Sequence, residues 1–343
     1  MTQQKKSFAD RNVFPSGKSI DGFEVMSLVG IGGFGEVYKV KDKKTNQMFA
    51  MKTEDINAQV KGLDVEIECI QKLNDSCFPK IRSVGQTKKV KYIVMNIYGS
   101  SISSIRLKTK DGKLPLDVSL PVGLEMIKVI EKFHSYGYVH RDIKPSNFLV
   151  QQNEEEPLVL IDFGLTKMMY DENGHLLDVD FDKQFVGTKK YSSIYAHYGN
   201  ALGKRDDLIS WFYSLLELIQ GSLPWSELSS NSEALECKEK ISPKELCKDL
   251  PKEFVQIFEI LYEMELESNP DYSKIKNIYT KMMEENNISP GSFNWLQFYT
   301  KNSSLSDIRK TLELYKTENK DDKNSDESNN EQDEMGDTCC CIF

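Results

Sequence analysis

Residues 140–147 read His-Arg-Asp-Ile-Lys-Pro-Ser-Asn, and this stretch decides how the rest of the chain is interpreted. It places the carboxylate of Asp142, the ammonium group of Lys144 and the amide of Asn147 at fixed spacing in one segment. Further along, residues 162–164 read Asp-Phe-Gly directly after an apolar run, so a second carboxylate stands at the end of a predicted strand. Magnesium is a hard cation that binds oxygen ligands, and both segments supply them. Together the two segments supply oxygen ligands of the kind that magnesium binds.

The segment resembles the catalytic loop of protein kinases, in which His-Arg-Asp is followed after four residues by Asn. This resemblance implies that Asp142 accepts the proton of the attacking hydroxyl, Lys144 neutralises the transferring phosphoryl group and Asn147 holds a second metal ion. Asp162 would bind the Mg²⁺ that bridges the phosphates of ATP. A lysine two residues after the aspartate is typical of serine/threonine kinases rather than tyrosine kinases. Arg141 would pair with an anion on the activation segment.

A glycine-rich stretch precedes these segments, and residues 30–37 fit the pattern G-x-G-x-x-G-x-V. Glycines allow a β-hairpin to lie close over phosphates and to donate backbone N–H groups to them. The chain continues as a strand through Val40, whereas a dinucleotide-binding fold would start a helix here. Alone, the motif also fits a glycine-rich hairpin that binds nothing. The candidate nucleotide-binding residues of this hairpin are Val29, Gly30, Ile31, Gly32, Gly33, Phe34, Gly35 and Val37.

Lys52 follows Ala50 and Met51 on the next predicted strand, where its ammonium group would hold the α and β phosphates of ATP. Glu66, on the helix predicted to follow, is its expected ion-pair partner, and Glu68 on the same helix is the alternative. Taken alone, each charge would be a solvated surface group. Their position between the glycine-rich hairpin and the two aspartates is what favours a nucleotide site.

A slot for the adenine ring is predicted from apolar residues, because apolar walls suit a flat ligand. Met95 would close the back of this slot, and residues 96–99 would form the hinge whose backbone bonds the adenine edge, with Asn96 and Tyr98 at the site. Ordinary core packing is the other interpretation of the apolar set. The walls of the slot would be Val29, Val37, Ala50 and Leu149.

Hydrophobic periodicity divides the chain into a strand-rich part and a helix-rich part. Residues 23–52 alternate apolar and polar positions, as antiparallel strands do. From Leu120 the pattern is helical, with Pro121 in the first turn of a long helix. The helix before it should bury Val65, Cys69, Ile70 and Leu73, and later helices are expected at 206–219, 254–266 and 272–283. The predicted class is α+β: a bilobal protein kinase fold with a small, mostly antiparallel β N-lobe carrying one helix and a larger, mainly α C-lobe.

The predicted domain organisation is a kinase domain between two extensions. Its parts are an N-terminal extension (1–19), the kinase domain (20–298, with N-lobe 20–96, hinge 96–99 and C-lobe 100–298), a possible helical extension (299–316) and an acidic tail (317–343). The tail has almost no apolar residues, so it cannot offset its ordering entropy by burial and is expected to be disordered.

Charge and cysteine usage exclude several classes of protein. The net charge is -9, and residues 317–337 alone hold nine acidic residues against two lysines, so the rest of the chain is almost balanced. A chain without a broad basic field is not expected to bind nucleic acid. Cys69, Cys77, Cys237 and Cys247 form no Cys-x-x-Cys pair, which argues against a zinc site or a disulfide framework. We find no signal peptide or membrane-spanning run and expect a cytoplasmic monomer.

Several segments resemble the casein kinase 1 family more than kinases in general. Ser193-Ile194 stands after residues 187–191, Gly-Thr-Lys-Lys-Tyr, where most kinases carry Ala-Pro-Glu. The other matching segments are 204–208, 221–225, 270–273 and 293–295, and the resemblance covers about residues 20–298. It implies a kinase that is active without phosphorylation of its activation segment. Between Gly164 and Gly187 the sequence offers only two hydroxyl groups, those of Thr166 and Tyr170.

The same resemblance implies a preference for serine or threonine near acidic or phosphorylated residues. Lys190 matches a basic residue that holds phosphate in the family, and Arg205 is a second candidate. Two features argue against this preference. Residues 226–230, where the family has another basic residue, read Ser-Glu-Leu-Ser-Ser, and the activation segment contains acidic residues that would repel acidic peptides. These acids are Asp171, Glu172, Asp178, Asp180 and Asp182.

The chain ends in Cys339-Cys340-Cys341-Ile342-Phe343, in which Cys340 fits a C-a-a-X prenylation motif of the geranylgeranyl type. One lipid gives only marginal membrane binding, so palmitoylation of Cys339 is the expected second signal. Alternatively, all three cysteines are palmitoylated, or the end is unmodified. Lipidation would anchor the protein to the cytoplasmic face of a membrane.

Two other functions share parts of this pattern. A pseudokinase scaffold usually lacks the strand lysine, the catalytic aspartate or the metal aspartate, and this chain has all three. A small-molecule kinase of related architecture would keep both aspartates, but Lys144 and the segment 187–191 favour a peptide substrate. We therefore expect ATP and Mg²⁺ in a cleft and protein substrates bearing serine or threonine.

Overall fold

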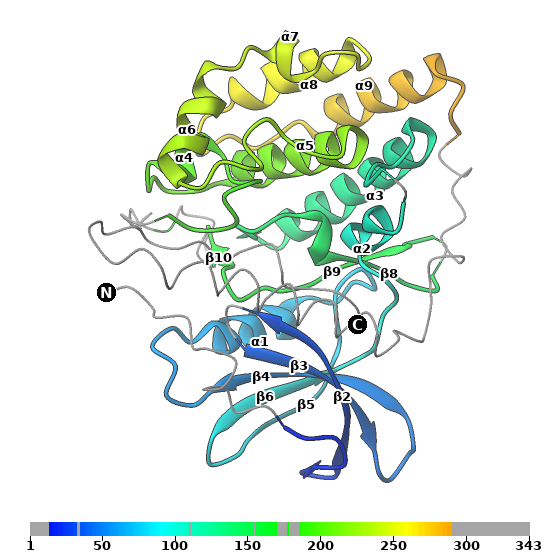
Figure 1. Ribbon diagram of the computed structural model, residues 1–343, viewed down its shortest axis with the longest axis vertical. Coiled ribbons are helices and arrows are strands. Elements are labelled where there is room, and N and C mark those ends of the chain that lie inside the picture. The colour runs from blue at the N-terminus through cyan, green and yellow to red at the C-terminus, as the bar shows by residue number, and fades with distance from the viewer. Residues whose placement is uncertain are drawn as a thin grey trace.

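The computed structural model describes residues 14–32, 35–109, 111–153, 155–169, 177 and 185–289. Figure 1 shows two lobes, with a curled β-sheet in one and a stack of helices in the other. This arrangement confirms the predicted α+β, bilobal fold. Several predictions lie outside the described residues, namely those on Gly33 and Phe34, the helix at 299–316, the acidic tail and the C-terminal cysteines.

The N-lobe sheet is antiparallel and has the strand order β1-β2-β3-β4-β6-β5. Alternate side chains of β3 and β4, including Tyr38, Val40 and Met51, are buried in a small core of their own. The predicted strands within 23–52 are confirmed. The strand bounds are β1 Ser19–Ile20, β2 Phe23–Gly32, β3 Gly35–Asp42, β4 Met48–Asp55, β5 Ile81–Gln86 and β6 Val90–Met95.

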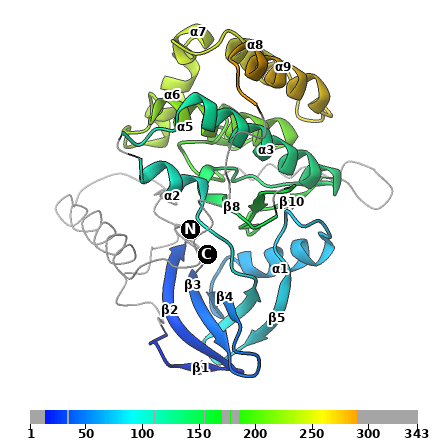
Figure 2. The same cartoon turned by 90° about the vertical axis from the view of Figure 1, so that its right-hand side faces the viewer.

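Helix α1, Gly62–Lys72, packs against the sheet at β4, β5 and β6 (Figure 2). Cys69 and Ile70 are buried as predicted, but the prediction for Val65 was wrong, because its side chain is 39% exposed. The buried stripe runs through Leu63, Glu66, Ile67 and Ile70, which is the i, i+3, i+4, i+7 pattern of one helix face. A glutamate therefore occupies a position on the inner face.

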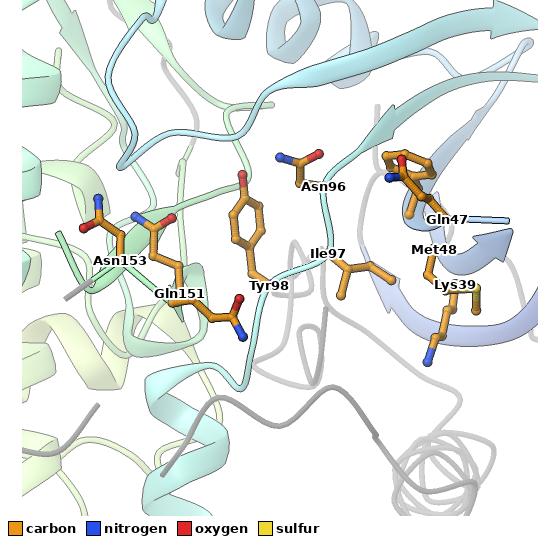
Figure 3. A pocket seen from close by; sticks show the side chains of 10 residues that line it. Lys39, Gln47, Met48, Asn96, Ile97, Tyr98, Gln151 and Asn153 are labelled. Atoms are coloured by element: carbon orange, nitrogen blue, oxygen red, sulfur yellow. The ribbon is translucent and has the colours of Figure 1, made fainter. Parts of the chain in front are cut away.

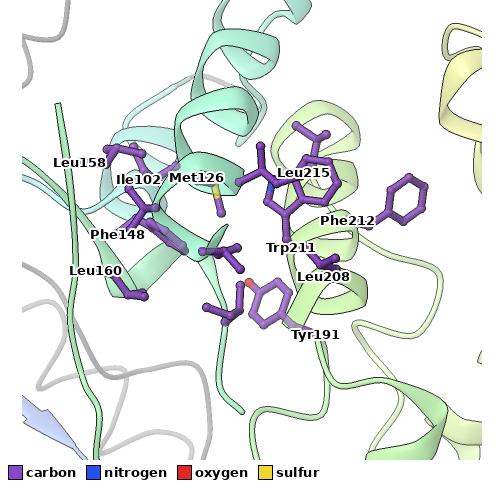
Figure 4. Close-up of a cluster of buried hydrophobic side chains, with 14 of the residues drawn as sticks. Ile102, Met126, Phe148, Leu158, Leu160, Tyr191, Leu208, Trp211, Phe212 and Leu215 are labelled. Carbon is purple, nitrogen blue, oxygen red and sulfur yellow. The ribbon is translucent and has the colours of Figure 1, made fainter. Parts of the chain in front are cut away.

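The C-lobe is mainly helical, and its centre lies where α3 packs against α5. Figure 4 shows Trp211 and Leu215 of α5 facing Met126 of α3, and the indole nitrogen of Trp211 donates to the carbonyl of Gly123 at 2.9 Å. The helix bounds are α2 Ile102–Leu107, α3 Leu116–Ser135, α4 Ile194–His197, α5 Lys204–Gln220, α6 Asn231–Lys240, α7 Pro243–Leu246, α8 Glu253–Tyr262 and α9 Tyr272–Glu285. In the regions that the structure describes, no helix combines the length and apolar character needed to cross a bilayer.

The start of α3 corrects one prediction. The helix begins at Leu116, so Pro121 lies in its second turn and does not open it. Pro115 stands at the N-cap with φ of -62° and ψ of 159°, an extended geometry that proline favours. Pro121 lacks the N–H that would bond a carbonyl one turn earlier, and the packed core accommodates this loss. The later helices match their predictions except that α8 ends at Tyr262.

Short strands and a turn of 3₁₀-helix flank the two loops that contain the candidate site residues of the C-lobe. β7 (Tyr138–Val139) pairs with β10 (Lys167–Met168), and β8 (Phe148–Val150) pairs with β9 (Leu158–Leu160). The 3₁₀ turn spans Pro145–Asn147. Because β8 and β9 are neighbours, the loop before β8 and the loop after β9 meet at the same place. Those loops contain Asp142 and Asp162.

Candidate active site

Lys52 lies on β4, flanked by β3 and β6, and its ammonium group joins two carboxylates. Nζ is 2.6 Å from Oε2 of Glu66 on α1 and 2.6 Å from Oδ1 of Asp162. Glu68 is not the partner, because its side chain is 74% exposed and faces Lys72 at 3.9 Å. Three residues that are far apart in sequence therefore meet at one cation, and the structure settles the choice between the two glutamates.

Burial and charge act in opposite directions on these three groups. Burial alone would lower the pKa of Lys52, but the two carboxylates raise it above its ordinary value. Burial likewise would raise the pKa of Asp162, and Lys52 holds it below its ordinary value. Burial raises the pKa of Glu66 and the charge of Asp162 adds to this rise, while Lys52 opposes it. Lys52 therefore favours the charged form of both carboxylates, against the effect of burial.

Asp207, at the start of α5, holds the loop that contains Asp142 through the backbone of that loop. Oδ1 of Asp207 accepts from the backbone N–H of Arg141 at 2.8 Å, and Oδ2 accepts from that of His140 at 2.6 Å. The Nε2 atom of His134 lies 2.8 Å from the same carboxylate. Arg141 needs this support because its φ is 67°, a left-handed conformation that costs a non-glycine residue about 1–2 kcal/mol. Asp207 therefore fixes the backbone that presents Asp142.

A second contact ties this loop to the activation segment. The side chain of Arg141, which the sequence suggested would meet an anion, donates from Nε to the carbonyl of Leu165 at 2.6 Å. His140 lies 3.1 Å from the carbonyl of Ile161 through Nε2, next to Asp162. Asp162 itself has φ of 68°, so its backbone also is held in a strained conformation. Strain at these two loops is a feature of functional sites.

Asp142 and Lys144 converge on Thr188, a residue that sequence reasoning did not assign to the site. The hydroxyl of Thr188 donates to Oδ1 of Asp142 at 2.7 Å and accepts from Nζ of Lys144 at 3.0 Å. Lys144 is also 3.0 Å from Oδ2 of Asp142. Thr188 belongs to the segment Gly-Thr-Lys-Lys-Tyr, residues 187–191, which resembles casein kinase 1. This segment therefore contacts the loop at 140–147 directly.

The oxygen donors at this place fit magnesium. The amide nitrogen of Asn147 donates to the carbonyl of Asp142 at 2.9 Å, which leaves its side-chain oxygen as the acceptor end of the amide. The N–H of Ile161 bonds the carbonyl of Asn147 at 3.0 Å, so Asn147 and Asp162 stay close. Within the described residues, no group of three or more His, Cys, Asp or Glu forms a metal cage. Magnesium needs none, because it binds through one or two carboxylates together with phosphate oxygens and water.

The glycine-rich hairpin forms between β2 and β3, where Gly30 faces Val37, Ile31 faces Glu36 and Gly32 faces Gly35. No side chain fits at Gly35 in this backbone conformation. Its φ is 149°, and an added Cβ would lie 1.7 Å from the carbonyl oxygen of Thr53 on β4. A Cβ at Gly30 would meet nothing within 4 Å, so the space beside Gly30 is open.

The predicted adenine slot is placed at the hinge end of the sheet. Ala50 pairs with Met95, and both are buried, whereas Val29 and Val37 are partly exposed along the glycine-rich hairpin. Leu149 is buried beside Tyr98 in a small apolar cluster, and Gly99 bonds Val150 at 2.8 Å. The hinge is therefore attached to β8, which carries Leu149, the predicted floor of the slot.

A cavity of about 640 Å³ lies beside the hinge (Figure 3). It shares Asn96 and Tyr98 with the predicted nucleotide site but none of the four apolar walls. N-lobe side chains stand on one side of it and residues after β8 on the other. Its lining is Lys39, Gln47, Met48, Phe49, Asn96, Ile97, Tyr98, Gln151, Gln152 and Asn153.

The structure gives Lys190 and Arg205 separate partners within the protein. Nζ of Lys190 is 3.3 Å from Oε1 of Glu217, a buried carboxylate that Arg106 also contacts at 3.1 Å. The guanidinium group of Arg205 stacks on the ring of Tyr195 at 3.5 Å. A substrate phosphate at Lys190 would have to compete with Glu217. Nothing in the spacing of the sequence indicated this ion pair.

Comparison with known proteins places the chain in a family. The sequence model of the family described as "Protein kinase domain" matches residues 23–290. A relative from Dictyostelium discoideum, named as a probable serine/threonine-protein kinase, is 33% identical over 287 residues. That match covers 82% of this chain and 58% of the relative, so the chain aligns with little more than half of the relative's length. The strand lysine, catalytic loop and Asp-Phe-Gly segment all lie within the matched region, and the chain belongs to the protein kinase domain family.

Proposed function

We propose that this chain is a protein serine/threonine kinase that transfers the γ-phosphoryl group of ATP to hydroxyl groups of protein substrates. The observation that carries the proposal is the ion-pair cluster of Lys52 with Glu66 and Asp162, each at 2.6 Å. This cluster places an ammonium group and a metal-binding carboxylate beneath the glycine-rich hairpin. A phosphoryl transfer site requires both, since its catalysis consists mainly of positioning and charge neutralisation.

Each residue of the candidate site then has a defined task. Asp142, held by Thr188, orients the substrate hydroxyl and accepts its proton, while Lys144 stabilises charge on the phosphoryl group. Lys52 holds the α and β phosphates, and the hinge residues Asn96 and Tyr98 hold the adenine edge. Asp162 and Asn147 would hold Mg²⁺, which supplies charge neutralisation to the phosphates when it is bound.

The test is phosphate transfer from γ-labelled ATP to dephosphorylated casein by the purified full-length chain. We expect label on serine and threonine, and loss of the label when EDTA removes Mg²⁺, because the charge of the phosphates is then no longer neutralised. Restoring Mg²⁺ after EDTA is the matched control. If no phosphoserine or phosphothreonine forms while Mg-ATP still binds, the chain is a nucleotide-binding scaffold and the proposal is wrong.

The rival functions are less well supported. A pseudokinase would not be expected to keep Lys52, Asp142 and Asp162 and to hold the first and last of them in one ion-pair cluster. A small-molecule kinase would not need residues 187–191 on the catalytic loop, yet Thr188 of this segment bonds Asp142 directly. Both observations favour a catalyst that acts on polypeptides.

We further propose that the kinase is casein kinase 1-like and active without phosphorylation of its activation segment. Three observations support this. Lys52 and Glu66 form their ion pair at 2.6 Å, which holds α1 against the sheet. Thr166 is buried, which makes it a poor substrate. Ser193 donates to Asp206 at 2.5 Å, which fixes the segment that carries Ser-Ile in place of Ala-Pro-Glu.

Preference for phosphorylated or acidic sites through Lys190 and Arg205 stays a prediction. It is checked by comparing rates on a peptide with phosphoserine three residues before the acceptor and on its unphosphorylated twin. If Lys190 leaves Glu217 to meet the phosphate, the phosphorylated peptide reacts faster, and a Lys190→Ala variant loses that difference. Equal rates on the two peptides would reject the preference.

We also propose that the protein is a monomer held at the cytoplasmic face of a membrane by lipids on Cys339, Cys340 and Cys341. The prediction is that replacing all three by serine moves the protein from the membrane pellet to the soluble fraction. A variant with Cys237→Ser, a free thiol on α6, serves as the control and should fractionate like the wild type. An unchanged membrane pool in the triple variant would contradict lipid anchoring.

A further inference from the structure

Lys238, on α6, is a charged residue inside the C-lobe, with only 4% of its surface exposed. Its ammonium group donates to the carbonyl of Lys189 at 2.6 Å and to the carbonyl of Ser192 at 2.7 Å. The Nε2 atom of His197 lies 3.0 Å away. An ammonium group has three N–H donors, and these contacts give each of them an uncharged acceptor.

Aromatic rings complete the surroundings of this cation. Nζ lies 5.1 Å from the ring centre of Trp225 and 5.4 Å from that of Tyr213, within the range of cation–π attraction. Burial lowers the pKa of His197 to about 3, and the charge of Lys238 adds to this effect. A neutral His197 can therefore accept the third hydrogen bond. Burying an ammonium group costs several kcal/mol unless such partners compensate it.

The two carbonyls that accept from Lys238 belong to one turn, formed by residues 188–192. Trp225 adds a third hydrogen bond, from its indole nitrogen to the carbonyl of Lys190 at 2.7 Å. Within the turn, the N–H groups of Tyr191 and Ser192 each donate to the carbonyl of Thr188 at 2.9 Å. The turn is therefore a compact unit, held from the side of α6 through its outward carbonyls.

The opposite side of this turn touches the catalytic loop. Thr188 donates to Asp142, and a Cβ added at Gly187 would lie 2.6 Å from the carbonyl oxygen of Arg141. The turn thus lies between Lys238 on one side and Asp142 on the other. A shift of the turn by a fraction of an ångström would alter the Thr188–Asp142 bond and the surface beside it, where the substrate hydroxyl must approach.

We infer that Lys238 is a positioning residue for the protein substrate. It holds residues 188–192 against the catalytic loop, so that the substrate hydroxyl meets Asp142 in the correct geometry. The inference rests on the proposed kinase function. Because Lys238 contacts the peptide side of the site and not the Lys52 cluster, its effect should be confined to the protein substrate.

The experiment compares Lys238→Met with Lys240→Met, both in the full-length chain. Lys240 is on the same helix, and its side chain is 72% exposed and paired with Glu236. Methionine keeps the length of the stem but removes the donors. With dephosphorylated casein as substrate, we expect Lys238→Met to raise the KM for casein and lower kcat, reducing kcat/KM about ten-fold or more. The KM for ATP should stay within about two-fold of the wild type. Lys240→Met should match the wild type in both.

A second variant covers the case in which Lys238→Met does not fold, as judged by its melting transition. Lys238→Arg keeps the charge, but a planar guanidinium group cannot aim three donors as an ammonium group does. We expect an increase in the KM for casein of about three-fold, again without a change for ATP. Unchanged casein kinetics in either folded variant, or equal losses for casein and ATP, would overturn the inference. Failure of the wild type to phosphorylate casein would instead reject the kinase function itself.

Discussion

Replacing Asp142 by asparagine is expected to lower kcat for phosphate transfer to casein by about 10³-fold while ATP binding changes little. Asparagine keeps the shape of the side chain and still offers an oxygen to the hydroxyl of Thr188, now 2.7 Å away. It cannot accept the proton of the substrate hydroxyl, and it removes the negative charge that faces Lys144. The loss should therefore appear in kcat, since Asp142 is not part of the Lys52 cluster that would hold the phosphates.

The measurement is the initial rate of label transfer, with Mg-ATP affinity measured separately by calorimetry. Asp117→Asn is the matched control, because Asp117 is an exposed aspartate in the first turn of α3. A casein rate within ten-fold of the wild type in Asp142→Asn would mean that another group accepts the proton. Loss of ATP affinity together with rate would indicate instead that the loop had collapsed.

The sequence predicted the parts of this site that lie in short, continuous motifs. The loop at 140–147, the glycine-rich hairpin and the strand with Lys52 each have a spacing that follows from backbone chemistry, and the structure brings Lys52 and Asp162 into one ion pair. Predicting that Lys52 pairs with Glu66 would have required knowing which side of α1 faces the sheet. Glu66 and Glu68 differ by about 200° around α1, and only the packed sheet shows which one faces inward.

Residues that support the motifs could not be found in the same way. Asp207 was visible only as part of a segment shared with one family, although it fixes the strained backbone at Arg141. Thr188 stood in another such segment. Lys238 gave no signal, because a lysine on a polar helix is normally solvated, and its burial depends on where α6 packs. Such contacts join distant segments, so no local pattern encodes them.

The errors in the secondary structure have similar causes. Val65 fits an apolar helix face on its own, but the face that packs inward runs through Leu63, Glu66, Ile67 and Ile70, and Glu66 pairs there with Lys52. Pro121 fits the first turn of a helix, but Pro115 and the packing of α3 against α5 extend that helix by a turn. In both cases tertiary packing outweighs a local preference.

Replacing Lys52 by methionine should have the second large effect, a fall in kcat/KM for ATP of about 10²-fold or more, because an ammonium group at the phosphates is lost. It should also lower the free energy of unfolding by about 3 kcal/mol at pH 7.5, since two carboxylates remain in a largely buried site without their cation. Lys72→Met is the control. Lys72 and Glu68 are a largely exposed pair 3.9 Å apart, and their loss should cost less than about 0.5 kcal/mol.

The pH dependence separates the two effects of Lys52→Met. Without the lysine, the pKa of Glu66, which is already raised, should rise further, and the pKa of Asp162 should rise above its unfolded value. Their charged forms then destabilise the folded state as the pH increases. The stability deficit relative to the wild type should therefore shrink as the pH falls from 7.5 towards 5, as followed by thermal melts. Adding Glu66→Gln to Lys52→Met removes one of the two charges, so it should recover part of the stability but none of the activity. A deficit that is the same at every pH would show that Lys52 acts by packing and not by charge.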